Sequence, residues 1–207
     1  MSDFLKAMQF RHACKKFDSD KKIDEGDFSK ILEFGRISPS SFGMEQWKFL
    51  VVQTPEKRAS LQEACWGQPQ VVESSHVVII LAKVEDVKPG TGYVKEMFER
   101  RNLPEDAFNL YLEKYESYFK TEIDPYMNTF AWSSKQCYLA LANMMTGAAS
   151  LRIDSCPIEG FSREAVDTLL KLDTNELQTA VIVTFGYRAG EQTPCFRQDK
   201  DQVIDYI

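Results

Sequence analysis

The sequence predicts an α+β fold, in which helices flank a central β-sheet. Three apolar runs rich in β-branched residues carry this prediction: residues 48–53 (KFLVVQ), 76–83 (HVVIILAK) and 179–187 (TAVIVTFGY). Short runs of this kind between polar residues are typical of buried strands. Long stretches with helical spacing of apolar residues separate the three, so strands and helices alternate along the chain.

The expected helices share polar residues at their beginnings and apolar residues at helical spacing behind them. They cover 3–9, from the N-cap Asp24 through Gly35, from Thr54 with Pro55 at the first helical position, 93–120, and from the N-cap Ser162 to Leu172. Residues 37–47 have the turn chemistry of an ordered loop. A short last strand is expected within residues 202–207, where it could be added to a partner's sheet.

The most apolar helix is expected from about Tyr126 to Leu151. Its second half is apolar on nearly every face, which a helix on the surface of a soluble protein cannot be. The helix must therefore be covered all round, either within one subunit or across a dimer interface.

The length and composition favour one domain over residues 1–207. The chain has 43% hydrophobic residues, and no Pro/Gly/Ser-rich or charged linker divides it. Its net charge of −6 gives no general attraction to nucleic acid or to anionic membranes. Any anionic cofactor must instead be held by a few placed cations.

The cysteines and the N-terminal residues indicate a soluble cytoplasmic protein. The five cysteines are scattered and form no CxxC pair, so we expect free thiols in a reducing compartment. No uninterrupted apolar stretch resembles a signal peptide, and the β-type apolar runs are far too short to span a bilayer.

Several familiar catalytic motifs are missing. No GxGxxG follows a strand, and the sequence contains no GxxxxGK[ST], GxSxG or HExxH. With only two histidines, a metal site or a mechanism based on histidine has almost no groups to use. If the protein is an enzyme, an organic cofactor is expected to carry the reaction.

Four segments, taken together, resemble the oxygen-insensitive bacterial nitroreductases and the related NAD(P)H:flavin oxidoreductases. They are residues 11–18 (RHACKKFD), 38–41 (SPSS) with Trp47 after them, Lys135-Gln136, and 154–161 (DSCPIEGF). Each segment alone is a common surface pattern, and only their agreement in order and spacing points to the family. The resemblance implies a nitroreductase-like fold with a mixed central sheet. It also implies an intertwined homodimer with the long helix buried at the interface and FMN bound between the subunits.

The resemblance also implies roles for individual residues. Arg11 and Arg197 would hold the FMN phosphate, Lys15 would place a positive charge beside the flavin ring, and the Pro157–Gly160 turn would present backbone N–H groups, including that of Glu159. The full implied set of FMN-binding residues is Arg11, His12, Ala13, Lys15, Pro39, Ser40, Ser41, Gly43, Gln68, Gln70, Gln136, Pro157, Ile158, Glu159, Gly160 and Arg197. Pro39, Ser40 and Ser41 would complete the partner's site. Phe42, Tyr118 and Phe119 are candidates for stacking on the second substrate.

The chain departs from the family pattern at several of these positions. Ala13 stands where a serine is common, and Cys195 where many members have a lysine, so one phosphate cation is missing unless Lys200 replaces it. Gly67, Gln68 and Gln70 occupy the segment where relatives carry Asn and Lys, and Gly43 and Gln46 replace common Asn and Pro. These changes bear on FMN affinity, redox potential and substrate preference.

The function implied is an FMN-dependent oxidoreductase. It would take a hydride from NADH or NADPH and reduce small molecules such as nitroaromatics, quinones or flavins by two electrons in a ping-pong cycle, with no metal and no side chain as essential acid or base. Two alternatives stay open. One is another reaction of the same superfamily, such as reductive dehalogenation, for which residues 84–125 would differ. The other is a flavin-binding protein with little turnover.

Overall fold

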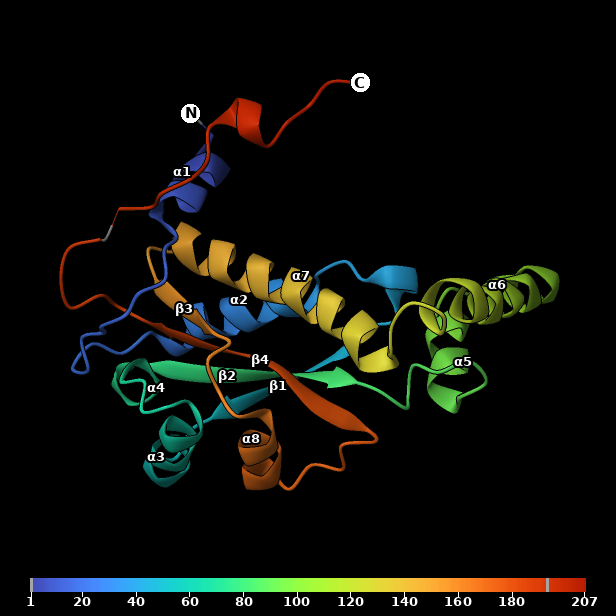
Figure 1. Cartoon of the computed structure of the whole chain (residues 1–207), viewed down its shortest axis with the longest axis horizontal. Coiled ribbons are helices and arrows are strands. Elements are labelled where there is room, and N and C mark those ends of the chain that lie inside the picture. Colours follow the sequence, from blue (N-terminus) through green and yellow to red (C-terminus); the bar gives the residue numbers. More distant parts are fainter. Residues whose placement is uncertain (1, 193) are drawn as a thin grey trace.

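A four-stranded sheet lies between two layers of helices in the computed structural model, which describes residues 2–192 and 194–207 (Figure 1). The strands are β1 (Trp47–Val52), β2 (His76–Lys83), β3 (Asp154–Ile158) and β4 (Leu177–Gly186), in the order β1-β2-β4-β3. The helices are α1 (Asp3–Phe10), α2 (Glu25–Arg36), α3 (Pro55–Ala64), α4 (Gln70–Glu73), α5 (Gly92–Glu99), α6 (Glu105–Tyr118), α7 (Thr129–Ser150) and α8 (Arg163–Leu170). The three strands expected from the apolar runs are therefore confirmed.

The expectation of a mixed sheet is wrong for the described residues. All three strand pairs are antiparallel, and the one parallel pairing among these residues is the isolated bridge between Ala13 and Ser155. β3 lies at an edge of the sheet, which is where a strand can tolerate Pro157. The sequence analysis had treated this segment only as a turn.

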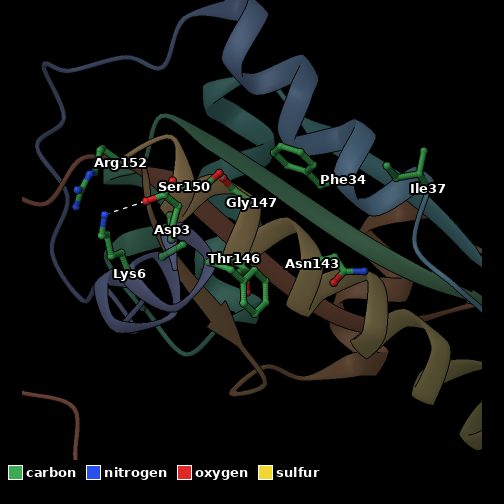
Figure 2. A pocket seen from close by; sticks show the side chains of 12 residues that line it. Asp3, Lys6, Phe34, Ile37, Asn143, Thr146, Gly147, Ser150 and Arg152 are labelled. Atoms are coloured by element: carbon green, nitrogen blue, oxygen red, sulfur yellow. Dashed lines mark hydrogen bonds and ion pairs between the residues drawn. The ribbon is translucent and has the colours of Figure 1, made fainter. Parts of the chain in front are cut away.

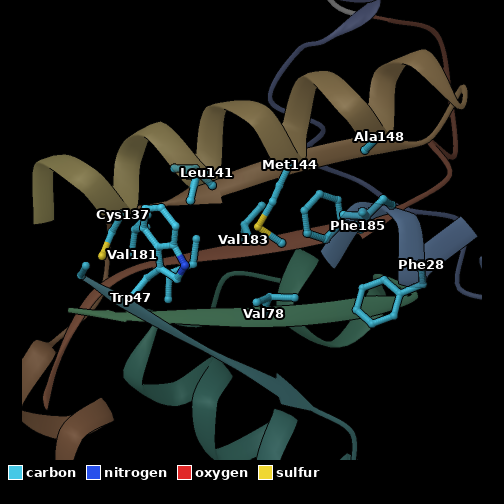
Figure 3. Close-up of a cluster of buried hydrophobic side chains, with 14 of the residues drawn as sticks. Phe28, Trp47, Val78, Cys137, Leu141, Met144, Ala148, Val181, Val183 and Phe185 are labelled. Atoms are coloured by element: carbon cyan, nitrogen blue, oxygen red, sulfur yellow. The ribbon is translucent and has the colours of Figure 1, made fainter. Parts of the chain in front are cut away.

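Alternation along β2 divides the core into two parts. Val78, Ile80 and Ala82 face α7 and α2, whereas Val77 and Ile79 face the layer of α3, α4 and α8. Successive side chains of a strand point to opposite faces, so a strand buried on both faces is apolar throughout. Figure 3 shows the first of these two parts, between α7 and the sheet.

The helices α2 and α7 pack closely because glycines meet the partner helix. A Cβ atom at Gly147 would stand 2.1 Å from Cδ2 of Phe34, and one at Gly35 would stand 2.8 Å from Met144. Glycine therefore permits a backbone approach that no larger residue allows at these two positions. The expected N-caps Asp24, Thr54 and Ser162 are confirmed, each accepting a hydrogen bond from a backbone N–H in the first turn.

Two expected elements differ from the structure. The single helix over 93–120 is divided into α5 and α6, because Asn102 has a left-handed backbone (φ 49°) and Pro104 is the N-cap of α6. The last residues form a short 3-10 helix, Lys200–Gln202, followed by irregular chain in place of a strand. This segment runs past α1 and away from the sheet (Figure 1).

Within the described chain, α7 is covered on one face only. Cys137, Leu141 and Met144 are among its buried residues, whereas Leu139 and Ser150 are exposed on the opposite face. The sequence predicted that α7 is covered all round. No described part of the chain covers its exposed face.

His76 makes the stability of this fold depend on pH. Its ring stacks on Phe28 with 3.7 Å between centroids, and burial, followed by the charges of Arg58 and Lys22, lowers its pKa from 6.5 to about 4. Because the folded state keeps the ring neutral, the unfolded state binds more protons between these two pH values, and stability is lost as the pH falls through them. We expect a loss of about 1 kcal/mol from this half-buried group.

Urea denaturation of the wild type and of His76→Gln at pH 7 and pH 5 measures this effect. The free energy of unfolding should decrease more steeply with falling pH in the wild type than in the variant. Equal pH dependence in the two proteins would contradict the prediction. The comparison between proteins matters because carboxyl groups elsewhere titrate in both.

Candidate active site

The segment that begins with Arg11 lies along the edge strand β3. The backbone N–H of Cys14 donates to the carbonyl of Ser155 at 3.0 Å, next to the Ala13–Ser155 bridge. Because the segment is extended, its side chains alternate: His12 and Cys14 are buried, while Arg11 and Lys15 point outward on the other side. Two cations predicted to bind FMN are therefore presented together at the end of the sheet.

A buried ion pair holds this part of the fold together. The Asp154 carboxylate accepts hydrogen bonds from the backbone N–H of Arg188 at 2.9 Å and from its Nε at 3.0 Å. Nδ1 of His12 lies 3.7 Å from Oδ1 of the same carboxylate. The His12 side chain thus packs inward, and only its backbone remains available for the ligand contact predicted for it.

A chain of hydrogen bonds links Lys15 to two other chain segments, residues 68–70 and residues 156–160. Its Nζ donates to Sγ of Cys156 at 3.5 Å, and Nε2 of Gln70 lies 3.9 Å from the same sulfur and 2.9 Å from Oε1 of Gln68. Nε2 of Gln68 in turn donates to the carbonyl of Gly160 at 2.7 Å. The structure therefore brings Lys15, both predicted glutamines and the Pro157–Gly160 turn into one hydrogen-bonded group, named here the Lys15–Gly160 network.

The thiol at the centre of this network is neutral. Burial raises the pKa of Cys156, and the neighbouring Lys15 opposes that rise only in part. Lys15 therefore brings a positive charge that no thiolate cancels. Asp154, which pairs with Arg188, is the first residue of β3, the strand that also contains Cys156.

Trp66 is a member of this region that the sequence analysis missed. A Cβ atom at Gly160 would stand 2.9 Å from Cζ3 of Trp66, so the indole covers the turn closely. The side chain is nevertheless 71% exposed, and its backbone is left-handed (φ 57°). The one sequence signal that could have identified Trp66 is its place beside Gly67 at the end of a helix. Helices often end in residues with positive φ, which a glycine indicates.

The loop that carries Ser40 and Ser41 is tied to α7. Oε1 of Gln136 accepts from the backbone N–H of Ser41 at 3.0 Å, and Oγ of Ser38 accepts from Asn143 at 2.9 Å. Gln136, which the resemblance places at the edge of the flavin ring, here supports this loop. No hydrogen bond between described residues joins the loop to the Lys15–Gly160 network.

The predicted substrate aromatics divide into two kinds. Phe42 and Tyr118 are half-buried, with ring centroids 5.2 Å apart. Phe119 is only 3% exposed and packs edge-on against Trp132 at 5.1 Å. Its role as a substrate contact does not fit this burial. A run of aromatics in a helical segment more often packs a core, as Phe119 does.

Arg197 lies in the segment that returns past α1. Nε2 of Gln192 donates to the carbonyl of Gln9 at 3.1 Å, and Sγ of Cys195 lies 3.9 Å from the carbonyl of Arg11. Arg197 itself is exposed, and its Nη1 donates to the carbonyl of Phe196. These contacts bring the segment of Arg197 beside Arg11.

The cations of the region have no carboxylate partner among the described residues. None of the ion pairs formed by residues 2–192 and 194–207 includes Arg11, Lys15 or Arg197. In a chain of net charge −6, exposed cations without acidic neighbours suit an anionic ligand. Over the same residues, no cluster of three or more His, Cys, Asp or Glu side chains could hold a metal ion, and none of the helices is long and apolar enough to cross a membrane.

The cavity shown in Figure 2 lies elsewhere. It has a volume of about 600 Å³ and lies between α1, α2 and α7, where Phe4, Phe34, Ile37 and Thr146 line it. None of the predicted FMN-binding residues lines it. Its apolar walls belong to the exposed face of α7 and not to the Lys15–Gly160 network.

Known proteins share both this sequence and this fold. The sequence pattern of the Nitroreductase family matches residues 8–187. YfkO of Bacillus subtilis, which bears the name "Putative NAD(P)H nitroreductase", is 42% identical to the chain over 216 residues, covering 100% of this chain and 98% of YfkO. A nitroreductase-like protein of Streptococcus mutans has a TM-score of 0.88 at 20% identity, covering 99% of this chain and 98% of its own.

A nitroreductase structure from Exiguobacterium sibiricum, solved in complex with FMN, has a TM-score of 0.84 at 19% identity and covers 100% of this chain and 98% of its own. At such identities the solved structures show that the fold is shared. The family pattern and the full-length similarity to YfkO establish the family as well, since they cover nearly every residue discussed above. The chain belongs to the nitroreductase family.

Proposed function

We propose that the protein is an FMN-dependent oxidoreductase that takes a hydride from NADH or NADPH and reduces a small oxidant, such as a nitroaromatic, a quinone or a flavin. The Lys15–Gly160 network carries this proposal, because it joins two of the four segments that resemble the family, residues 11–18 and 154–161. The name of YfkO, "Putative NAD(P)H nitroreductase", and the FMN in the Exiguobacterium sibiricum structure support the same reaction class.

The residues of this region fit FMN in charge and in shape. Arg11 and Arg197 would hold the phosphate through forked, charge-assisted hydrogen bonds. The neutral amides of Gln68 and Gln70 can each donate and accept along the polar edge of the flavin ring. Gly160 has no side chain, so its backbone permits a closer approach than that of any larger residue. The same lack of a side chain makes room for the Trp66 indole.

Once bound, FMN supplies the group that accepts a hydride and passes two electrons to the oxidant. The chain contributes position and electrostatics. Lys15 stabilises negative charge at the flavin ring, and its own position is fixed by Cys156. Phe42 and Tyr118 offer apolar surface on which an aromatic oxidant can stack. Solvent can deliver the protons, so no acid or base is needed among the side chains.

We further propose that the active unit is a homodimer. Phe4 (69% exposed), Ile37 and Leu139 form an apolar face around α1, α2 and α7. A contiguous exposed apolar face is typical of an association site. The C-terminal segment leaves the body with Phe196 and Tyr206 exposed, as expected of an arm that reaches a partner. A second copy would also bring its Ser40 loop to the network.

An absorption spectrum and size-exclusion chromatography with light scattering test the proposal. The purified protein should be yellow, should elute as a dimer, and should oxidise NADH or NADPH when menadione or a nitrofuran is added. A colourless protein that does not bind added FMN would refute it. A yellow protein whose flavin absorbance is not bleached by either nucleotide would identify a flavin-binding protein without turnover.

A further inference from the structure

The loop between α2 and β1 contains an unusual concentration of left-handed backbone. Phe42, Gly43 and Glu45 have φ values of 56°, 65° and 46°. Glycine adopts this conformation freely, but a bulky aromatic residue such as phenylalanine rarely does, because its Cβ atom crowds the backbone there. Such an outlier persists only where the surroundings hold it in place, and it often marks a functional position.

Two residues from opposite ends of α5 hold this loop: Tyr93 in its first turn and Arg101 just after its last residue. Nη2 of Arg101 donates to the carbonyl of Phe42 at 2.6 Å, and the Tyr93 hydroxyl donates to the carbonyl of Met44 at 2.9 Å. Met44 is fully buried among the aromatic side chains of the α5–α6 region. Both hydrogen bonds are made to backbone carbonyls of the strained stretch, so they act on its conformation directly.

Arg101 is itself held in one place. Its guanidinium carbon lies 5.2 Å from the ring centroid of Phe98 and 5.1 Å from that of Tyr111, within the range of cation–π attraction. A Cβ atom at Gly43 would stand 3.3 Å from Nη2 of Arg101. The absence of a side chain at residue 43 therefore serves both the left-handed backbone and the approach of the arginine.

The loop connects the Arg101 contact to Phe42, the proposed substrate contact, and to Ser40. The Phe42 ring meets Tyr115 edge-on at 5.1 Å, which fixes the ring once its backbone is fixed. Ser40 is tied into the same stretch, because its Oγ accepts from the backbone N–H of Glu45 at 2.9 Å. A shift of the Phe42 carbonyl would thus move both the aromatic wall and the serine loop.

We propose that Arg101 is a positioning residue that sets the affinity of the enzyme for aromatic oxidants by holding Phe42 in its left-handed conformation. The inference rests on the proposed function, in which Phe42 contacts the oxidant. Arg101 touches neither the oxidant nor the flavin in this assignment. It acts through the backbone of the loop.

The Arg101→Ala variant tests the proposal by steady-state kinetics. Loss of a charge-assisted hydrogen bond should raise the KM for menadione about tenfold. The kcat should stay within about twofold, because the lost contact serves ground state and transition state alike. Ferricyanide, an inorganic oxidant with no ring to stack, should keep its KM.

Two further variants separate positioning from general damage. Arg100→Ala removes the same charge from the adjacent residue, whose guanidinium bonds the Glu45 side chain at 3.1 Å and no backbone carbonyl, and its menadione KM should stay at the wild-type value. Arg101→Lys keeps the positive charge and an N–H donor but loses the planar guanidinium, and it should show a smaller rise in KM than Arg101→Ala. Amide hydrogen exchange gives a readout without turnover: residues 40–46 should exchange faster in Arg101→Ala than in Arg100→Ala.

The outcomes are distinguishable. If the wild-type protein binds no FMN, the proposed function fails first. If the wild type turns over but Arg101→Ala keeps its menadione KM and the exchange rate of its loop, the role of Arg101 is refuted alone. A menadione KM that rises equally in Arg100→Ala would also refute it, because the effect would then follow charge and not the Phe42 contact.

Discussion

The Arg11→Gln/Arg197→Gln double variant should bind FMN at least about a hundredfold more weakly than the wild type. Each arginine can make charge-assisted hydrogen bonds to the phosphate, and each such bond contributes roughly 1.5–3 kcal/mol, or about tenfold in affinity or more. The effect should be large here because Cys195 stands where many relatives carry a further cation. Of the three cations assigned to the cofactor, only Lys15 would then remain, and it is assigned to the flavin ring and not to the phosphate.

Quenching of FMN fluorescence on titration with apoprotein measures the dissociation constant. The matched control is Lys16→Gln/Lys21→Gln, which removes the same two charges from exposed residues of the same part of the chain and should change the constant by less than about threefold. The wild-type affinity should also fall with added salt more steeply than that of the Arg11/Arg197 variant. Equal affinities for wild type and double variant would place the phosphate elsewhere.

The parts of this fold that the sequence predicted are those fixed by local pattern. The β2 run HVVIILAK is buried on both faces, so its composition alone identifies a strand. The caps Asp24 and Ser162 bond their own helices two or three residues away, and such bonds are visible as local spacing. In contrast, β3 is a five-residue edge strand containing Pro157, which local propensity disfavours.

The candidate site shows the same division. Arg11 and Lys15 could be predicted because their motif is contiguous, and the structure places them on one side of one extended segment. The contacts of Arg101 and Tyr93 could not, because their partners lie 59 and 49 residues away and involve backbone carbonyls that carry no sequence signature. Phe119 was misassigned for a related reason: its burial depends on Trp132 of another helix.

Gly147→Ala should destabilise the protein by about 2 kcal/mol, although the same change in an exposed helix stabilises it by roughly 1 kcal/mol. The reason is the packing of α2 on α7. A Cβ atom at residue 147 would lie 2.1 Å from Cδ2 of Phe34 and 2.6 Å from two further atoms of that ring, far inside van der Waals contact. The two helices must separate or the ring must turn, and either change costs more than the gain in helix propensity.

Urea denaturation of Gly147→Ala should be compared with Gly92→Ala, at the first position of α5, where an added Cβ meets nothing within 4 Å. The second variant should be as stable as the wild type or slightly more so. Adding Phe34→Leu to Gly147→Ala should recover part of the loss, giving a coupling energy of about 1 kcal/mol in the double-mutant cycle, because the leucine removes the ring that the methyl group strikes. If Gly147→Ala proves as stable as Gly92→Ala, the close approach of α2 and α7 is not a constraint on this fold. Phe34 and Gly147 both line the apolar cavity in Figure 2, so the walls of that cavity would then be more adaptable than their packing implies.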